Sequence, residues 1–184
     1  MIKGQKIFLR EKKLEDAPLD YSWRIDEELS GLDATTPMRM SYKQYLRIYQ
    51  DELSYPVSWS KRFAIETYAN ETIGNCMYYD IDLVKLKAEL GIMIGNKEYW
   101  NQGFGADVVN TLTSHIFTDT NLTCIYLHTL SSNIRAQKSF SKCGFSSIKE
   151  NVRRNGYEFM LMELTKETWK RLDNVYPHGY IQSN

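Results

Sequence analysis

The segment WNQGFGADVV, at residues 100–109, places two glycines immediately before an amphipathic helical pattern. Gly103 and Gly105 flank Phe104 there. The first turn of a helix carries free backbone N–H groups and the positive end of the helix dipole. Because the two glycines lack side chains, a pyrophosphate can approach these N–H groups closely. The segment therefore predicts a phosphate-binding loop at a helix start, and a tight turn without a ligand is the alternative.

Two common phosphate-binding motifs do not fit this loop. A P-loop requires Gly-Lys followed by Ser or Thr, whereas Gly105 is followed by Ala106 and Asp107. A dinucleotide fingerprint requires a third glycine at the position of Val108. It also requires an acidic residue at the end of the next strand, and the segment CIYLHTLSSN contains none. A nucleotide site of either kind is therefore not expected.

Hydrophobic periodicity around the loop predicts a mixed α/β domain. Alternating patterns predict strands at residues 6–13, 62–68, 73–83, 87–95, 124–130, 146–154 and 157–164. Apolar residues at helical spacing predict one or two helices in 14–29 and further helices at 42–53, 103–118, 133–143 and from 166. The strand–helix–strand order of residues 87–130 predicts that some strands of the sheet are parallel.

Composition is that of one compact domain spanning residues 1–184, with a loosely ordered tail from about residue 172. Lys plus Arg and Asp plus Glu each number 23 in the 184 residues, so no general affinity for nucleic acid or acidic membranes is expected. Cys76, Cys124 and Cys143 lack metal-ligand spacing, and we expect reduced thiols and no metal. The chain has no signal-peptide pattern and no membrane-spanning apolar run, which predicts a cytoplasmic protein.

Two longer segments, residues 88–109 and 125–145, resemble the GNAT family of acyl-CoA-dependent N-acetyltransferases. The pyrophosphate loop of that family reads Gln/Arg-x-x-Gly-x-Gly/Ala, and Trp100 stands here in place of the leading polar residue. The matching positions are Gly103, Gly105, Asn133, Ala136, Gly144 and Phe145. The likeness spans roughly residues 6–165 and is strongest for the branch that contains ribosomal-protein alanine and spermidine acetyltransferases.

This resemblance implies a central twisted mixed sheet with splayed central strands, flanked by about four helices. It implies transfer of an acetyl group from acetyl-CoA to a primary amine of a small molecule or peptide, by direct attack on the thioester. A homodimer is also implied. The cofactor-binding residues would be Ile92, Met93, Ile94, Gln102, Gly103, Phe104, Gly105, Ala106, Asn133, Ala136 and Phe140.

The attacking amine must lose a proton, because an alkylammonium group has a pKa near 10. Glu89 is our candidate general base. Strand alternation places Glu89 on the same face as Gly91 and Met93, two residues before the stretch expected to line the cofactor. A charged residue on a solvated strand face is the alternative. Backbone N–H groups near Met93 would stabilise the oxyanion.

The departing thiolate has no obvious proton donor. Many family members have a tyrosine four residues before the glycine of Gly144-Phe145, and this chain has Phe140. Ser139, Ser141 or a water could donate the proton instead, or the thiolate could leave unassisted. The substitution favours a second hypothesis, a catalytically weak or inactive acetyl-CoA-binding sensor or interaction module. A third hypothesis is a mixed α/β interaction domain without a cofactor.

The amine substrate is not identified by any motif. Asp26, Glu27, Glu28 and Asp33 could attract a cationic amine, and a solvated helix face is the alternative. A protein N-terminus, a polyamine, an amino sugar and an antibiotic all remain open. The histidines His115, His128 and His178 have no partner motif, and we expect them to be structural.

Overall fold

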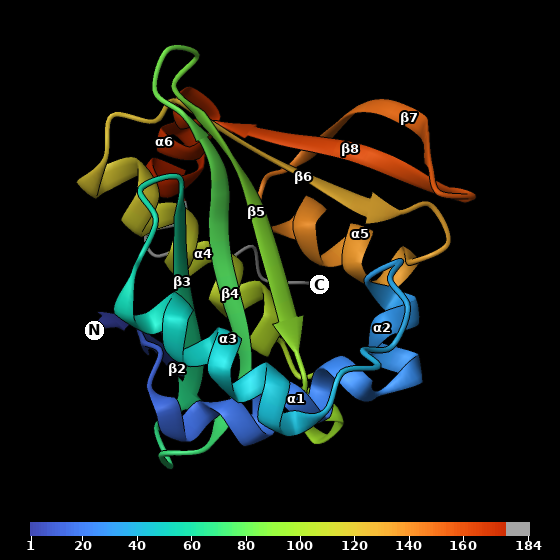
Figure 1. Ribbon diagram of the computed structural model, residues 1–184. Helices are drawn as coiled ribbons and strands as arrows, with labels where there is room; N and C mark the ends of the chain where they lie inside the picture. The colour runs from blue at the N-terminus through green and yellow to red at the C-terminus, as the bar shows by residue number, and fades with distance from the viewer. Residues whose placement is uncertain (176–184) are drawn as a thin grey trace.

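The computed structural model describes residues 1–175, without the side chains of residues 149–151 and 175. Its strands form one sheet in the order β1-β2-β3-β4-β5-β6-β8-β7 (Figure 1). The strands are β1 (Ile2–Lys3), β2 (Ile7–Glu11), β3 (Ser60–Thr67), β4 (Thr72–Asp82), β5 (Lys87–Ile94), β6 (Cys124–Leu130), β7 (Ser146–Arg154) and β8 (Tyr157–Thr165). The α-helices are α1 (Ala17–Ile25), α2 (Glu27–Leu32), α3 (Tyr42–Ser54), α4 (Phe104–Asp119), α5 (Ile134–Lys142) and α6 (Lys166–Val175). Two short 3₁₀ helices are η1 (Leu14–Asp16) and η2 (Lys97–Tyr99).

The sheet is mixed, as the sequence predicts. Strands β5 and β6 pair in parallel, because α4 carries the chain back across the sheet between them. The other neighbouring strands pair antiparallel. The two-residue strand β1 was not predicted, since it is too short to show an alternating pattern.

Helices cover both faces of the sheet (Figure 1): α1 and α3 cross the front of the view, and α4 lies behind. The predicted apolar face of α4 is confirmed, since each of its members is at most 1% exposed: Val108, Val109, Leu112, Ile116 and Phe117. Burying one such side chain stabilises the fold by roughly 1.5–3 kcal/mol. The main core therefore lies between α4 and the sheet, and a smaller cluster joins α1 and α3.

Most predicted element ends are confirmed. Ser41 and Gln44 form a capping box at the start of α3. Asn155 and Gly156 both have positive φ, 50° and 83°, which suits the tight turn between β7 and β8. The described part of the chain contains six α-helices, whereas the family resemblance implies about four. The two additional helices arise because Asp26 interrupts the first helical segment, between α1 and α2, and because α6 follows β8. Residues 176–184 of the predicted tail lie outside the described residues.

Strands β5 and β6 pair over their first three residues and then separate. They share the pairs Lys87–Cys124, Ala88–Ile125 and Glu89–Tyr126, while β5 continues to Ile94 and β6 to Leu130. Figure 1 shows the two strands diverging from this point. The splayed central strands implied by the family resemblance are thus present. No helix within residues 1–175 combines the length and the apolar character needed to cross a membrane.

Candidate active site

A cavity of about 410 Å³ lies at the open end of the splayed strands. It is bounded by the end of β5, the loop before α4, helix α5 and the end of α2. The residues that line it are Leu29, Leu32, Asp33, Ile92, Met93, Ile94, Tyr99, Trp100, Asn101, Gly103, Gly105, Ala106, Val109, Asn133, Arg135, Ala136, Lys138, Ser139, Phe140 and Lys142. Most cofactor-binding residues predicted from the sequence therefore line one cavity.

The glycine loop leaves open space in front of α4. Gly103 is the N-cap of α4 and has a φ of 83°, in the left-handed region that side chains disfavour. A Cβ atom added at Gly105 would meet only the Ser139 Oγ atom, at 4.0 Å. The Lys6 ammonium group donates a hydrogen bond to the carbonyl oxygen of Gln102 at 2.7 Å. The loop thus combines a free helix start with a nearby cation, an arrangement suited to a phosphate.

Two of the predicted cofactor residues do not line the cavity. The side chain of Gln102 donates to the carbonyl oxygen of Glu98. The ring of Phe104 packs against Tyr99, with 4.9 Å between ring centroids. Gln102 remains in the loop and Phe104 begins α4, so their backbone N–H groups are what they can offer to a ligand.

The side chain of Asn133 has a structural task. Its Oδ1 atom accepts a hydrogen bond from the Ala136 N–H at 3.1 Å and caps α5. Asn133 nevertheless lines the cavity. Of the two serines considered as proton donors, Ser139 lines the cavity and Ser141 does not.

Three cations on α5 were missed by the sequence reasoning. Arg135, Lys138 and Lys142 lie three and four residues apart and all line the cavity. This spacing places side chains on one face of a helix and could have revealed the cluster. The Arg135 guanidinium carbon lies 3.9 Å from the ring centroid of Trp100. The Trp100 indole N–H donates in turn to the Ile94 carbonyl oxygen at 2.7 Å, which ties the loop to the end of β5.

Glu89 is buried at the point where β5 and β6 part. The residue is 8% exposed, so it does not lie on a solvated strand face. Its Oε1 atom lies 2.8 Å from the Nδ1 atom of His128. From the sequence we expected His128 to be a structural histidine. Glu89 does not line the cavity; Ile92, three residues later and about 10 Å along the strand, does.

Two tyrosines flank the Glu89 carboxylate. Tyr79 lies opposite Glu89 on β4, and Tyr126 lies opposite it on β6. Burial, together with the negative charge of Glu89, raises the pKa of Tyr79 and of Tyr126. Both phenols therefore stay neutral near pH 7.

The acidic residues of the first helices are separated in the folded chain. Asp26 and Glu28, at the start of α2, both bind the Lys97 ammonium group, at 3.0 Å and 2.7 Å. Asp33, at the end of α2, lines the cavity instead. Asp33 is therefore the member of this cluster that is placed to meet a cationic substrate.

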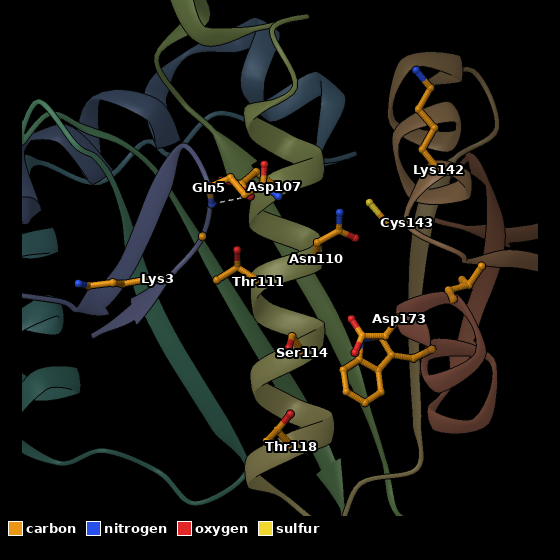
Figure 2. A pocket seen from close by; sticks show the side chains of 13 residues that line it. Lys3, Gln5, Asp107, Asn110, Thr111, Ser114, Thr118, Lys142, Cys143 and Asp173 are labelled. Atoms are coloured by element: carbon orange, nitrogen blue, oxygen red, sulfur yellow. Dashed lines mark hydrogen bonds between the residues drawn. The ribbon is translucent and has the colours of Figure 1, made fainter. Parts of the chain in front are cut away.

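A second cavity, also of about 410 Å³, lies on the other side of α4 (Figure 2). It runs along polar side chains of α4, among them Thr111 and Ser114, with residues 3–5 on one side and residues of α5 and α6 on the other. Its buried carboxylate, Asp107, accepts three backbone hydrogen bonds, from the N–H groups of Gln5, Lys6 and Ile7 at 3.0, 2.7 and 3.2 Å. Asp107 thus fixes the N-terminal turn, which in turn holds Lys6 beside the glycine loop.

None of the site residues predicted from the sequence lines this second cavity. Within the part of the chain that the structure describes, no three His, Cys, Asp or Glu side chains gather as a metal site. The first cavity is therefore the candidate active site.

Comparisons with known proteins agree with this geometry. The profile of the acetyltransferase (GNAT) domain matches residues 6–146. The spermidine N(1)-acetyltransferase of Vibrio cholerae is 32% identical over 85 residues, 46% of this chain and about half (49%) of that relative. An uncharacterized N-acetyltransferase, p20 of Bacillus licheniformis, is 26% identical over 152 residues, 82% of this chain and 84% of the relative.

Solved structures share the fold over nearly the whole chain. The Vibrio cholerae spermidine N-acetyltransferase in complex with CoA and spermine has a TM-score of 0.81 at 22% identity, covering 90% of this chain and 98% of that one. A dodecameric structure of the spermidine N-acetyltransferase from Vibrio cholerae has a TM-score of 0.72 at 20% identity, covering 89% and 96%.

Proposed function

The chain belongs to the acetyltransferase (GNAT) family, whose members move an acetyl group from acetyl-CoA to an amine, and we propose that its acceptor is a polyamine. The observation that carries the catalytic part of the proposal is the opening between β5 and β6. The glycine loop lies at its outer end and the buried carboxylate of Glu89 lies at its inner end. A thioester held between them would meet an amine beside a proton acceptor.

Acetyl-CoA would be bound along three walls of the cavity. The N–H groups of residues 102–106 would hold the pyrophosphate at the start of α4. The α5 cations Arg135, Lys138 and Lys142 add charge that complements its phosphates. Among residues 1–175, the β5 edge that faces β6 has no ladder partner beyond Glu89, so its backbone is available to the pantetheine arm.

Glu89 would act as the general base. It would take the proton of the ammonium group, directly or through a water, so that the neutral nitrogen can attack the thioester carbonyl carbon. Backbone N–H groups near Met93 would stabilise the oxyanion, and removing one such donor costs on the order of 10²-fold in rate. The carbon–sulfur bond then breaks, and the sulfur leaves with the bonding electrons.

Protonation of the leaving sulfur would not involve a tyrosine at position 140. Phe140 lines the cavity at the expected position and has no proton to donate. Ser139 is the serine that reaches the cavity, and its Oγ atom lies beside Gly105 on the phosphate side. A thiol with a pKa near 8.5 is a fair leaving group, so departure of the thiolate with help from water or without assistance is compatible with turnover.

A polyamine is the acceptor that these observations favour. The named activity of the Vibrio cholerae relative is acetylation of spermidine, and its crystal structure contains spermine. In this chain, Asp33 adds a carboxylate to the cavity wall, which suits a cationic substrate. Among the alternatives, a catalytically inactive acetyl-CoA-binding module is favoured by Phe140 alone.

We also propose that residues 1–184 act as one domain, that the protein works in the cytoplasm and that it self-associates. The dodecameric structure of the Vibrio cholerae enzyme supports self-association of this chain. The smallest self-associated form is a homodimer. Size-exclusion chromatography with light scattering would measure the assembly directly.

The activity is tested by thiol release from acetyl-CoA with spermidine, spermine, a peptide with a free N-terminus, and an aminoglycoside. We expect the polyamines to have the highest kcat/KM, and Glu89→Gln to lose most of the activity. Glu11→Gln, at an exposed position of β2, is the matched control. Acetyl-CoA at 100 times its Kd should stabilise the protein by about 2.7 kcal/mol. Stabilisation without turnover would support the binding module, and no stabilisation would contradict both.

A further inference from the structure

His128 and Glu89 form a contact that the proposed mechanism leaves unused. The two residues are 39 positions apart in the chain, and their side chains are 12% and 11% exposed. Resting on the proposed function, we propose that His128 is a positioning residue of the reaction. Its Nδ1–H group donates a hydrogen bond to the Glu89 carboxylate and holds it in place, so that the other carboxylate oxygen is free to accept the proton of the amine.

The backbone of His128 is fixed independently of β5. His128 pairs with Leu161 of β8, whereas the pairing of β6 with β5 has already ended at Tyr126. Strand alternation places Tyr126 and His128 on the same face of β6. The imidazole therefore reaches from the separated part of β6 to the Glu89 side chain, across the start of the opening.

Aromatic neighbours fix the orientation of the imidazole ring. The Tyr126 ring lies edge-on to it with 6.0 Å between centroids, and the Phe159 ring does so at 6.4 Å. The Nδ1 atom faces the Glu89 carboxylate, so the neutral tautomer with its proton on Nδ1 is the one that donates to this carboxylate. A ring held in this way limits the rotation of the carboxylate that it contacts.

The ionisable groups next to the His128–Glu89 pair include two tyrosines, neither of which is basic. Tyr79 on β4 and Tyr126 on β6 have raised pKa values and stay neutral. The charge of Asp80 also raises the pKa of both tyrosines, and the charge of Asp33 raises the pKa of Tyr79. The charge of Arg154 lowers the pKa of Tyr126. Among the described residues, His128 is the basic side chain within hydrogen-bond distance of the Glu89 carboxylate.

The proton balance is simple. The Oε2 atom of Glu89 takes one proton from the ammonium group, while Oε1 keeps the hydrogen bond that the Nδ1–H group of the neutral imidazole donates. The resulting carboxyl later releases this proton to water, which restores the carboxylate, and the imidazole keeps its own proton throughout. The freed amine then attacks the thioester, and no oxidant, reductant or further reactant is needed.

The test compares His128→Leu with His128→Asn. Leucine removes the contact, and asparagine keeps a hydrogen-bond donor near the Nδ1 position without a titrating ring. We expect His128→Leu to lower kcat roughly 10- to 100-fold, within the range that misplacing a catalytic group costs. We expect His128→Asn to lose less and to change the pH dependence of kcat. The KM for acetyl-CoA should change less than about twofold in both.

The matched control is His115→Asn, because His115 contacts Asp119 in a second histidine–carboxylate pair, at 2.6 Å on α4. It should retain wild-type kcat and pH dependence. A double-mutant cycle separates action through Glu89 from a structural effect. In a Glu89→Gln background, His128→Leu should cause no further loss of kcat.

Wild-type turnover is measured first, because its absence would overturn the proposed function and this inference together. With turnover established, two results would overturn this inference alone. One is wild-type kcat and pH dependence in both His128 variants. The other is a pair of losses that multiply in the double variant, since independent effects would mean that His128 does not act through Glu89.

Discussion

Glu89 and Tyr126 form the last ladder pair between β5 and β6, and the two strands separate beyond them. The pair therefore marks the inner end of the opening in which we place the thioester. The Glu89 carboxylate is buried at this position. A proton acceptor at the point where the sheet divides links the fold directly to the proposed chemistry.

Replacing Gly103 with valine should weaken the anion site. Gly103 has a φ of 83°, so a branched side chain strains the loop and obstructs the approach to the N–H groups of α4. We expect the Kd for acetyl-CoA, measured by calorimetry, to rise at least about tenfold, as a strain of roughly 1–2 kcal/mol alone would suggest. Gly156→Val is the control, because Gly156 has the same φ of 83° in the distant β7–β8 turn. Equal affinities in the two variants would refute the phosphate loop.

The α5 cations should contribute to cofactor affinity through charge. Alanine at Arg135, Lys138 or Lys142 should raise the Kd for acetyl-CoA by a few-fold each, because exposed charge pairs contribute roughly 0.2–1 kcal/mol. The slope of affinity against salt concentration should fall in the same variants. Lys61→Ala on β3, which does not line the cavity, should change neither quantity. A salt dependence equal to wild type in the triple variant would contradict the assignment.

Asp33 should affect the amine rather than the cofactor. Asp33→Asn removes the α2 carboxylate that lines the cavity, and we expect the KM for spermidine to rise about fivefold. The KM for acetyl-CoA should remain unchanged in the same steady-state assay. Glu27→Gln, at an exposed position of α2, is the control. An effect on both KM values would show that Asp33 supports the cavity instead of binding the amine.

A tyrosine at position 140 should supply the missing proton donor. Phe140 lines the cavity, and we expect a phenol at this position to reach it. We expect Phe140→Tyr to raise kcat about tenfold, a part of what general acid catalysis provides. Phe145→Tyr is the control, because Phe145 contacts Phe140 but does not line the cavity. An unchanged kcat would mean that departure of the sulfur does not limit turnover.

The stability of the fold should fall in acid through Asp16. Burial alone would raise the pKa of Asp16, but the Arg10 guanidinium, at 2.7 Å from both carboxylate oxygens, and the Lys13 N–H outweigh it and lower this pKa. Because the pKa of Asp16 is lower in the folded state, its contribution to stability is fully present above the pKa of the unfolded state, near 3.9. This contribution disappears as pH falls through the pKa of the folded state.

The free energy of unfolding, measured in urea, should therefore decrease below about pH 4 in the wild type. Asp16→Asn should be less stable at pH 7 and should lose less on acidification. Glu15→Gln, at the exposed neighbouring position, should behave as the wild type does. An identical pH dependence in Asp16→Asn would exclude this pair as a source of acid sensitivity.

Local patterns in the sequence predicted most of the elements and the glycine loop. The α4 stripe from Val108 to Phe117 repeats with the period of a helix, and Asn155-Gly156 has the chemistry of a tight turn, so both can be read within a few residues. The sequence does not predict strand β1, because two residues are too few to show the alternating pattern of a strand. The spacing of the α5 cations can be read from the sequence, but the sequence does not show which face of α5 lies against the cavity.

By itself, the sequence determined the type of each main element, the parallel crossover through α4 and the position of the bare helix start, because these depend on side-chain periodicity and on residues close together in the chain. Tertiary structure alone decided that Glu89 meets His128, that Lys97 engages Asp26 and Glu28, and that Asp33 is left for the cavity. These contacts follow from where the β5–β6 ladder ends and how α2 packs, and such long-range arrangements depend on the whole core rather than on any local pattern.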